Sequence, residues 1–340
     1  MDHCIAAGGG NGFGASGLLK AIDEWRSMRL FQSLDRKQCE IVFYSEGSEY
    51  WVHLEPIIHH LVYDFGRTVC YLSSENDDPG LAQSHPRILP FYIGDGVVRT
   101  RLFRELEATV MVMTMPDLET FHIKRSVHPV HYVYIFHAAV STHMVYRKHA
   151  FDHFDEVFCV GPHHMAEIRR AEEVYALKPK TLVEHGYGRL DSILKISANG
   201  SPNTREKEVS RILIAPSWGG FGRDGLLEMA GGELISGFLD AGLHVTLRPH
   251  PMTRIGSPRL LAGLIKQFAS HPQFIYEDHV ASVDSLDAAD LMVSDWSGAA
   301  FDFAYGVERP VLFIDIPRKV NNADYDELGI EPLEVRVRSE

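Results

Sequence analysis

The feature that most constrains the fold is a repeated alternation of short apolar runs with longer stretches of helical spacing. Most of the short runs are rich in β-branched residues and apolar on both faces. Such strands belong in a parallel sheet that helices cover. The first part of the chain therefore predicts strands at 40–44, 68–72, 88–93, 109–114, 130–136, 156–160 and 181–184, and helices at 50–63, 97–106 and 162–175.

The alternation stops near residue 196, where Ser, Asn, Gly, Pro, Thr and alternating charges replace apolar residues up to residue 211. This composition is typical of a linker. The alternation then restarts, with strands predicted at 211–215, 244–247, 274–276, 291–293 and 311–315 and helices near 226–241 and 258–268. We therefore predict an α/β protein of two Rossmann-like domains, 1–195 and 211–340, joined by the linker 196–210, with parallel sheets that face a central cleft.

Charge and hydropathy exclude several classes of function. The 340 residues include 33 Lys and Arg against 46 Asp and Glu, a formal net charge of −13. Binding of nucleic acid irrespective of its sequence needs clustered cations, so we expect no nucleic-acid partner. No apolar run approaches the roughly 20 residues of a membrane-spanning helix, and no basic amphipathic helix is evident. We expect a cytoplasmic protein that is at most peripheral at the inner face of the membrane.

Two patterns that suggest a cofactor or a metal fit poorly. Gly12-Phe-Gly14-Ala-Ser-Gly17 matches G-x-G-x-x-G, but the segment before it is too short and too poor in β-branched residues for a central strand. We expect residues 1–17 to be a glycine-rich leader, which could be either flexible or ordered. His149 and His153 have i, i+4 spacing without the Glu or Cys of a zinc motif. We therefore expect no metal and no separate cofactor.

Ligands of open parallel sheets bind beyond the carboxyl ends of the strands, so the residues there are the candidates for chemistry. Ser294, Asp295 and Ser297 lie between a predicted strand and a predicted helix, where they can bind phosphate or simply cap the helix. Arg248-Pro-His250-Pro follows another strand. Its two prolines restrict the turn that presents the guanidinium and the imidazole together, which suits a diphosphate; a stiff surface loop is the alternative.

Three further turns fall at the same strand ends. His137 ends a strand, and a neutral imidazole there can act as a general base toward a hydroxyl or be a satisfied structural histidine. Ser217 follows the first strand of the second domain, and Gly188 and Arg189 follow the last strand of the first. Glycines in these turns let the backbone approach a ligand closely or serve as an ordinary hinge. Together these turns predict a site between the domains.

Several motifs, taken in order, resemble a known family. They are Gly-Tyr-x-Arg-x-Asp, Ala-Pro-Ser-Trp, Arg-Pro-His-Pro, Ser-Asp-Trp-Ser, Phe-Asp-Phe-Ala-Tyr-Gly and Arg-Pro-Val, and they follow one another over residues 186–315. The chain resembles the CDP-glycerol glycerophosphotransferases, the teichoic-acid primases and polymerases, which have the two-domain GT-B architecture. A looser resemblance covers residues 132–160.

The resemblance implies transfer of glycerol phosphate, or a related polyol phosphate, from a CDP-activated donor to a hydroxyl of a glycan or lipid-linked acceptor. CMP would be released, and the product would belong to a cell-surface polymer of the teichoic-acid or capsular kind. Arg248 and His250 would face the donor diphosphate, Ser294 and Ser297 would bind phosphate, and His137 would correspond to the histidine proposed as base. The first domain would then take the acceptor and the second the nucleotide donor.

Two departures from the family pattern leave alternatives open. The family usually has Gly after its first-domain histidine and a second Ser in Ser-Asp-Tyr-Ser-Ser, where this chain has Ala138 and Gly298. The missing hydroxyl removes a hydrogen bond to phosphate worth about 1.5–3 kcal/mol. The alternatives are a GT-B nucleotide-sugar glycosyltransferase or UDP-sugar 2-epimerase, and an inactive member that binds a nucleotide or a partner.

Overall fold

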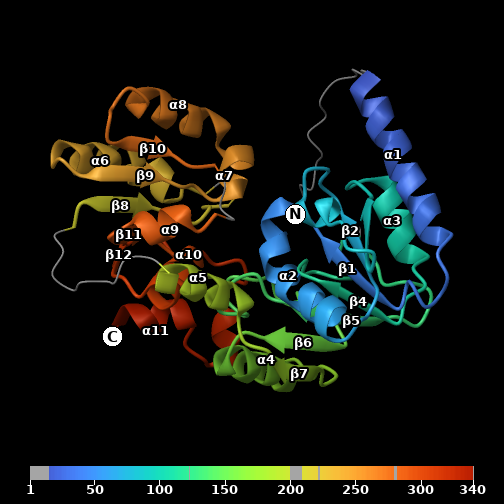
Figure 1. The fold of residues 1–340 in the computed structure, drawn as a ribbon. Helices are drawn as coiled ribbons and strands as arrows, with labels where there is room; N and C mark the ends of the chain where they lie inside the picture. Colours follow the sequence, from blue (N-terminus) through green and yellow to red (C-terminus); the bar gives the residue numbers. More distant parts are fainter. Residues whose placement is uncertain (1–14, 122, 200–208, 221–222, 279–281, 340) are drawn as a thin grey trace.

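Two parallel sheets organise the chain, as the alternation predicts (Figure 1). The computed structural model describes residues 15–121, 123–199, 209–220, 223–278 and 282–339. Within them, the first sheet has seven strands in the order β3-β2-β1-β4-β5-β6-β7, and the second has five in the order β10-β9-β8-β11-β12. All neighbouring strands are parallel. The predicted α/β class with two parallel sheets is confirmed.

The strands lie close to their predicted positions, because a buried parallel strand must be apolar on both faces. The first sheet contains β1 (Ile41–Ser45), β2 (Val69–Ser73), β3 (Ile88–Tyr92), β4 (Val110–Met113), β5 (His131–Ile135), β6 (Glu156–Cys159) and β7 (Thr181–Glu184). The second contains β8 (Arg211–Ile214), β9 (His244–Leu247), β10 (Phe274–Tyr276), β11 (Leu291–Ser294) and β12 (Val311–Phe313).

The helices include four that the sequence pattern did not predict. The first domain, by which we mean the seven-stranded sheet and its helices, has α1 (Ala15–Gln32), α2 (Trp51–His59), α3 (Val97–Arg104), α4 (Pro162–Val174) and α5 (Gly188–Asn199). The second domain, built on the five-stranded sheet, has α6 (Leu226–Asp240), α7 (Pro251–Gly256), α8 (Pro258–Phe268), α9 (Asp284–Ala288) and α10 (Ala299–Phe301), and α11 (Leu333–Ser339) ends the described chain. The unpredicted helices are α5, α7, α9 and α11.

Short irregular turns extend some of these helices. A π-helical turn at His60–Asp64 follows α2, and another at Asp302–Val307 follows α10. Short 3-10 turns occur at Ser48–Tyr50, Pro79–Ala82 and Tyr325–Leu328.

Helix α5 changes the expected extent of the linker. It begins at Gly188, in a predicted turn, and continues through 196–199, which the composition assigns to the linker. The remaining linker residues 200–208 lie outside the described residues, as do residues 1–14 of the predicted leader with Gly12 and Gly14. The last leader residues, 15–17, begin α1.

The core of the first domain lies on both faces of its sheet. Adjacent residues of a strand point to opposite faces, and on β1 both Val42 and Phe43 are fully buried. Val42 belongs to the cluster that includes Met28 of α1, whereas Phe43 packs in the cluster that includes Leu54 of α2. The two-sided burial explains why this strand is apolar throughout.

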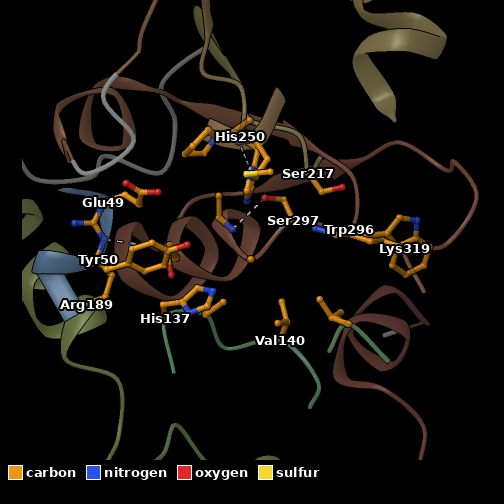
Figure 2. A pocket seen from close by; sticks show the side chains of 18 of the residues that line it. Glu49, Tyr50, His137, Val140, Arg189, Ser217, His250, Trp296, Ser297 and Lys319 are labelled. Atoms are coloured by element: carbon orange, nitrogen blue, oxygen red, sulfur yellow. Dashed lines mark hydrogen bonds and ion pairs between the residues drawn. The ribbon is translucent and has the colours of Figure 1, made fainter. Parts of the chain in front are cut away.

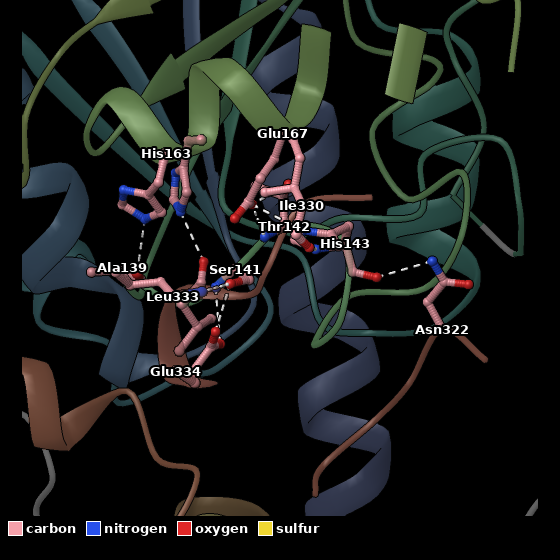
Figure 3. Close-up of polar contacts among 12 residues, drawn as sticks. Ala139, Ser141, Thr142, His143, His163, Glu167, Asn322, Ile330, Leu333 and Glu334 are labelled. Carbon is pink, nitrogen blue, oxygen red and sulfur yellow. Dashed lines mark hydrogen bonds and ion pairs between the residues drawn. The ribbon is translucent and has the colours of Figure 1, made fainter. Parts of the chain in front are cut away.

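The C-terminal segment crosses back from the second sheet to the first domain (Figure 3). Asn322 Nδ2 donates to the carbonyl oxygen of His143 at 2.9 Å. The Glu334 carboxylate of α11 accepts hydrogen bonds from Ser141 N at 2.9 Å and Ser141 Oγ at 2.6 Å. Leu333 packs against the first core. The end of the predicted second domain, 211–340, is therefore built into the body of the first.

Candidate active site

A cavity of about 420 Å³ lies between the two domains (Figure 2). Residues that directly follow β1, β4 and β5 line it from the first domain, and residues that follow β8, β9 and β11 line it from the second. It therefore lies at the carboxyl ends of both sheets, where open parallel sheets bind ligands.

Most of the predicted site residues meet in this cavity. Its lining includes six of the nine: His137, Arg189, Ser217, Arg248, His250 and Ser297. Figure 2 shows the two histidines on opposite sides of the space. The roles assigned to these residues stay predictions, but their convergence is a property of the fold.

Three predicted site residues lie outside the lining. Ser294 is fully buried, and its hydroxyl donates to the carbonyl oxygen of Ala215 at 2.7 Å. Asp295 accepts hydrogen bonds from Ser217 N at 2.6 Å and Ser217 Oγ at 3.1 Å, so it orients a residue that does line the cavity. Gly188 begins α5 and faces Pro56 of α2. These three residues therefore do not face the cavity directly.

His250 is oriented by the backbone of its own turn. Its Nδ1 accepts a hydrogen bond from Met252 N at 3.1 Å and caps α7. The neutral ring therefore carries its proton on Nε2, where it is a donor. Burial, with a smaller contribution from the charge of Lys319, lowers the pKa of His250 to about 3. At neutral pH the ring is an uncharged hydrogen-bond donor in the cavity.

His137 faces the same cavity from the end of β5. Burial lowers its pKa to about 4, so the ring is neutral at pH 7. Tyr50 contacts it edge to face, with ring centroids 5.2 Å apart, and Tyr187 OH donates to its carbonyl oxygen at 3.1 Å. Its Nδ1 has no hydrogen-bond partner among the described residues. A neutral imidazole at this edge of the cavity can accept a proton from a substrate hydroxyl.

Buried arginines from both domains line the cavity. Arg248 is buried, and its Nη1 donates to Ser285 Oγ at 3.1 Å and to the Ser282 carbonyl oxygen at 3.3 Å. Arg189 Nε lies 3.9 Å from Asp302 Oδ2. Burial raises the pKa of Asp302 to about 6, which weakens its hold on the arginine below neutral pH.

Several lining residues were missed by the sequence analysis. Glu46, Glu49 and Tyr50 follow β1, so the strand-end rule that selected His137 could have found them. Burial raises the pKa of Glu46 to about 7. Lys319 lies beyond β12 in the segment that returns to the first domain. No local pattern marks it, because only the crossing of the chain brings it to the cavity.

The histidine spacing that could suggest a metal does not form a helical pair. His149 lies in a turn, where its Nδ1 is 2.6 Å from Asp152 Oδ2, and His153 lies in the following turn. Among the residues that the structure describes, no group of three His, Cys, Asp or Glu side chains could hold a metal ion. None of the described helices is long and apolar enough to span a membrane.

The fold and the cavity define the architecture as GT-B, with a site between two Rossmann-like domains. The family described as CDP-glycerol:poly(glycerophosphate) glycerophosphotransferase has a model that matches residues 133–319, which is more than half of the chain. The chain belongs to this family and is a glycerophosphotransferase-like transferase. The matched segment runs from β5 to Lys319 and contains both histidines.

Solved structures share the fold at low sequence identity. A variant of the wall teichoic acid polymerase TagF soaked with CDPG is 12% identical, with a TM-score of 0.55 over 89% of this chain and 80% of that chain. UDP-GlcNAc 2-epimerase from Neisseria meningitidis, bound to UDP-GlcNAc, is 10% identical, with a TM-score of 0.54 over 82% and 83%. A search of curated proteins found no significant match.

Proposed function

We propose that the chain transfers glycerol phosphate, or a related polyol phosphate, from a CDP-activated donor to a hydroxyl acceptor and releases CMP. The observation that carries the proposal is the convergence of His137 from the first domain with Arg248 and His250 from the second on one cavity. Phosphoryl transfer depends mainly on positioning and on stabilisation of charge. Neutral imidazoles and buried guanidinium groups supply both.

In the proposed step, the acceptor oxygen bonds to the phosphorus of the polyol phosphate. The bond from this phosphorus to the CMP oxygen breaks, and CMP leaves with the electron pair. The hydroxyl proton passes to the imidazole of His137, and the Nε2 proton of His250 forms a hydrogen bond to the leaving phosphate. An anionic donor raises the pKa of a nearby histidine, so His137 becomes a stronger base once the donor is bound.

The acceptor would approach from the first-domain side, where Glu49, Tyr50 and His53 line the cavity. A glycan or lipid-linked precursor of a teichoic-acid-like or capsular polymer fits the proposed reaction. With a net charge of −13, electrostatic attraction to anionic lipids is weak. We therefore propose a cytoplasmic protein that meets a lipid-linked acceptor through peripheral contact.

Ligand-induced thermal stabilisation tests the donor without knowledge of the acceptor. A ligand at 100 times its Kd stabilises the native state by about 2.7 kcal/mol. We expect CDP-glycerol, CDP-ribitol or CMP to raise Tm, and UDP-N-acetylglucosamine and NAD to leave it unchanged. A shift with the UDP-sugar alone would instead support the glycosyltransferase or epimerase alternative, and absence of any shift would contradict nucleotide binding.

Replacement of His250 tests catalysis. We expect His250→Ala to reduce CMP release from CDP-glycerol by roughly 100-fold, because the donor to the leaving group is lost. The control is His244→Ala, on the exposed start of β9, which should retain activity. Equal activity of both variants, with the fold retained, would contradict the proposed role of His250.

A further inference from the structure

Lys319 is a cation of the cavity for which the sequence analysis assigned no role. It lines the main cavity and also a side cavity of about 310 Å³. Ser217 and Trp296 line both cavities as well. Figure 2 shows Lys319 and Trp296 at the same end of the cavity. Lys319 therefore stands where the two spaces adjoin, on the donor side of the proposed site.

The backbone on both sides of Lys319 is held in place. Trp296 Nε1 donates to the carbonyl oxygen of Ile316 at 3.0 Å, and Arg223 Nη1 donates to that of Val320 at 2.7 Å. Both contacts come from the second domain. Asn321 Nδ2 donates to the carbonyl oxygen of Val145 in the first domain at 2.7 Å. These contacts fix where the chain presents the ammonium group.

Lys319 makes no direct ion pair with the residues that the structure describes. In the described part of the chain, no carboxylate lies within ion-pair distance of its ammonium group. Asp295 is the acid that acts on it most strongly, and its carboxylate also accepts two hydrogen bonds from Ser217. Arg223 adds positive charge nearby. A half-buried cation with this environment favours an anionic ligand.

We propose that Lys319 binds the diphosphate of the donor and stabilises the negative charge that develops on the leaving phosphate. The proposal rests on the proposed function in one respect: the anion is taken to be the diphosphate of the nucleotide donor. It assigns the binding of phosphate to a residue after β12 and does not require the buried hydroxyl of Ser294.

Lys319 also acts on both histidines. Burial is the main cause of the low pKa of His137 and of His250, and the charge of Lys319 lowers both further. An anion bound at Lys319 offsets this charge, so both pKa values rise when the donor binds. The same residue would thereby bind the donor and make His137 a stronger base. Asp295, Arg223 and Glu334 are the other charged groups that act on Lys319.

Calorimetric titrations with inorganic pyrophosphate, CDP-glycerol and CMP test the proposal. Lys319→Met keeps much of the side-chain length without the charge, and Lys319→Arg keeps the charge. We expect Lys319→Met to weaken pyrophosphate and CDP-glycerol about tenfold or more, with CMP less affected and Lys319→Arg closer to wild type. The control, Lys266→Met on the exposed side of α8, should bind all three as wild type does. Unchanged pyrophosphate and CDP-glycerol affinity in Lys319→Met would overturn the proposal.

A second readout needs no ligand. In a proton NMR titration of the ring Cε1–H signals, Lys319→Met should raise the pKa of His137 and of His250, and the dispersion of the spectrum reports whether the variant is folded. If a folded variant leaves both pKa values unchanged, Lys319 does not face the histidines and the proposal fails. Lys319-dependent binding of pyrophosphate without binding of CDP-glycerol would uphold the anion site and overturn the proposed donor.

Discussion

Ala138 and Gly298 form one contact across the cleft. A Cβ atom at position 298 would lie 3.1 Å from the Ala138 Cβ atom and 3.5 Å from Val140 Cγ1. These two positions are the ones at which the sequence departs from the family pattern. The methyl group of Ala138 occupies space that a side chain at 298 would need. The two departures are therefore one packing change, and they do not by themselves indicate an inactive protein.

This contact predicts a strong coupling between two substitutions. Gly298 has helical backbone angles, φ −61° and ψ −26°, so Gly298→Ser meets no backbone strain and its cost is the crowding with Ala138. We expect Gly298→Ser to lower the free energy of unfolding by about 1–3 kcal/mol, and Ala138→Gly/Gly298→Ser to recover most of that loss. Urea denaturation of the single and double variants measures the coupling. Simple additivity would show that the two positions do not interact.

At the scale of elements, the loop after His137 is held by side chains of α4 and the C-terminal segment (Figure 3). His163 Nε2 and His164 Nε2 pair with the carbonyl oxygens of Ala139 at 3.1 Å and Val140 at 2.8 Å. The next residues bond to buried carboxylates of Glu167 and Glu334. Two histidines of α4 therefore hold a loop that lines the cavity.

Helix α11 contacts both sides of the cleft. Glu334 and Arg338 are four residues apart and so lie on one face of the helix. Glu334 accepts hydrogen bonds from Ser141 in the first domain. The guanidinium of Arg338 lies 3.6 Å from the ring centroid of Trp296 in the second domain. This short helix therefore links the loop that follows His137 to the turn that carries Ser297.

Truncation of Glu334 should loosen that loop. Glu334→Ala leaves the N–H and the hydroxyl of Ser141 without their acceptor, and each such buried group costs about 1–3 kcal/mol. We expect a lower free energy of unfolding and faster hydrogen–deuterium exchange at 139–143, with the five-stranded sheet unaffected. Glu331→Ala, at an exposed position before α11, is the control. Unchanged exchange in the loop of Glu334→Ala would show that other contacts hold it.

At the scale of the whole molecule, buried neutral histidines make stability depend on pH. His164 is fully buried, and burial lowers its pKa to about 3 from the ordinary value of 6.5. Between these values the unfolded chain binds more protons than the native protein, so this contribution to stability is complete above pH 6.5 and is lost as the pH falls toward 3. Each pH unit of the window corresponds to about 1.4 kcal/mol.

The pH effect can be isolated with His164→Gln, which keeps a donor for the Val140 carbonyl but does not titrate. We expect the stability advantage of the wild type over this variant to be largest at pH 7 and to shrink steadily toward pH 5. Denaturant unfolding curves at several pH values measure it. A difference that is independent of pH would contradict the buried, neutral state of His164.

The sequence predicted the strands well and the helices unevenly. Strands such as β7 and β9 match their predicted ranges, because burial on both faces leaves a local mark in the sequence. Helix α5 was missed, since its first residues read as a glycine-containing turn and its last residues have the composition of a linker. Helix α11 was missed because its contacts are with residues nearly 200 positions earlier in the chain.

Some residues of the candidate site could likewise be predicted from the sequence, and others could not. His137, Arg248 and His250 were found because each follows a strand, and parallel strands present their carboxyl ends at one edge. The sequence by itself thus determined that there are two parallel sheets, that strands alternate with helices, and which turns carry most of the predicted site residues. Only the tertiary structure decided that Ser294 is buried away from the cavity, that Ala138 meets Gly298 and that Lys319 reaches the donor side. These are contacts between distant segments, and local periodicity carries no information about them.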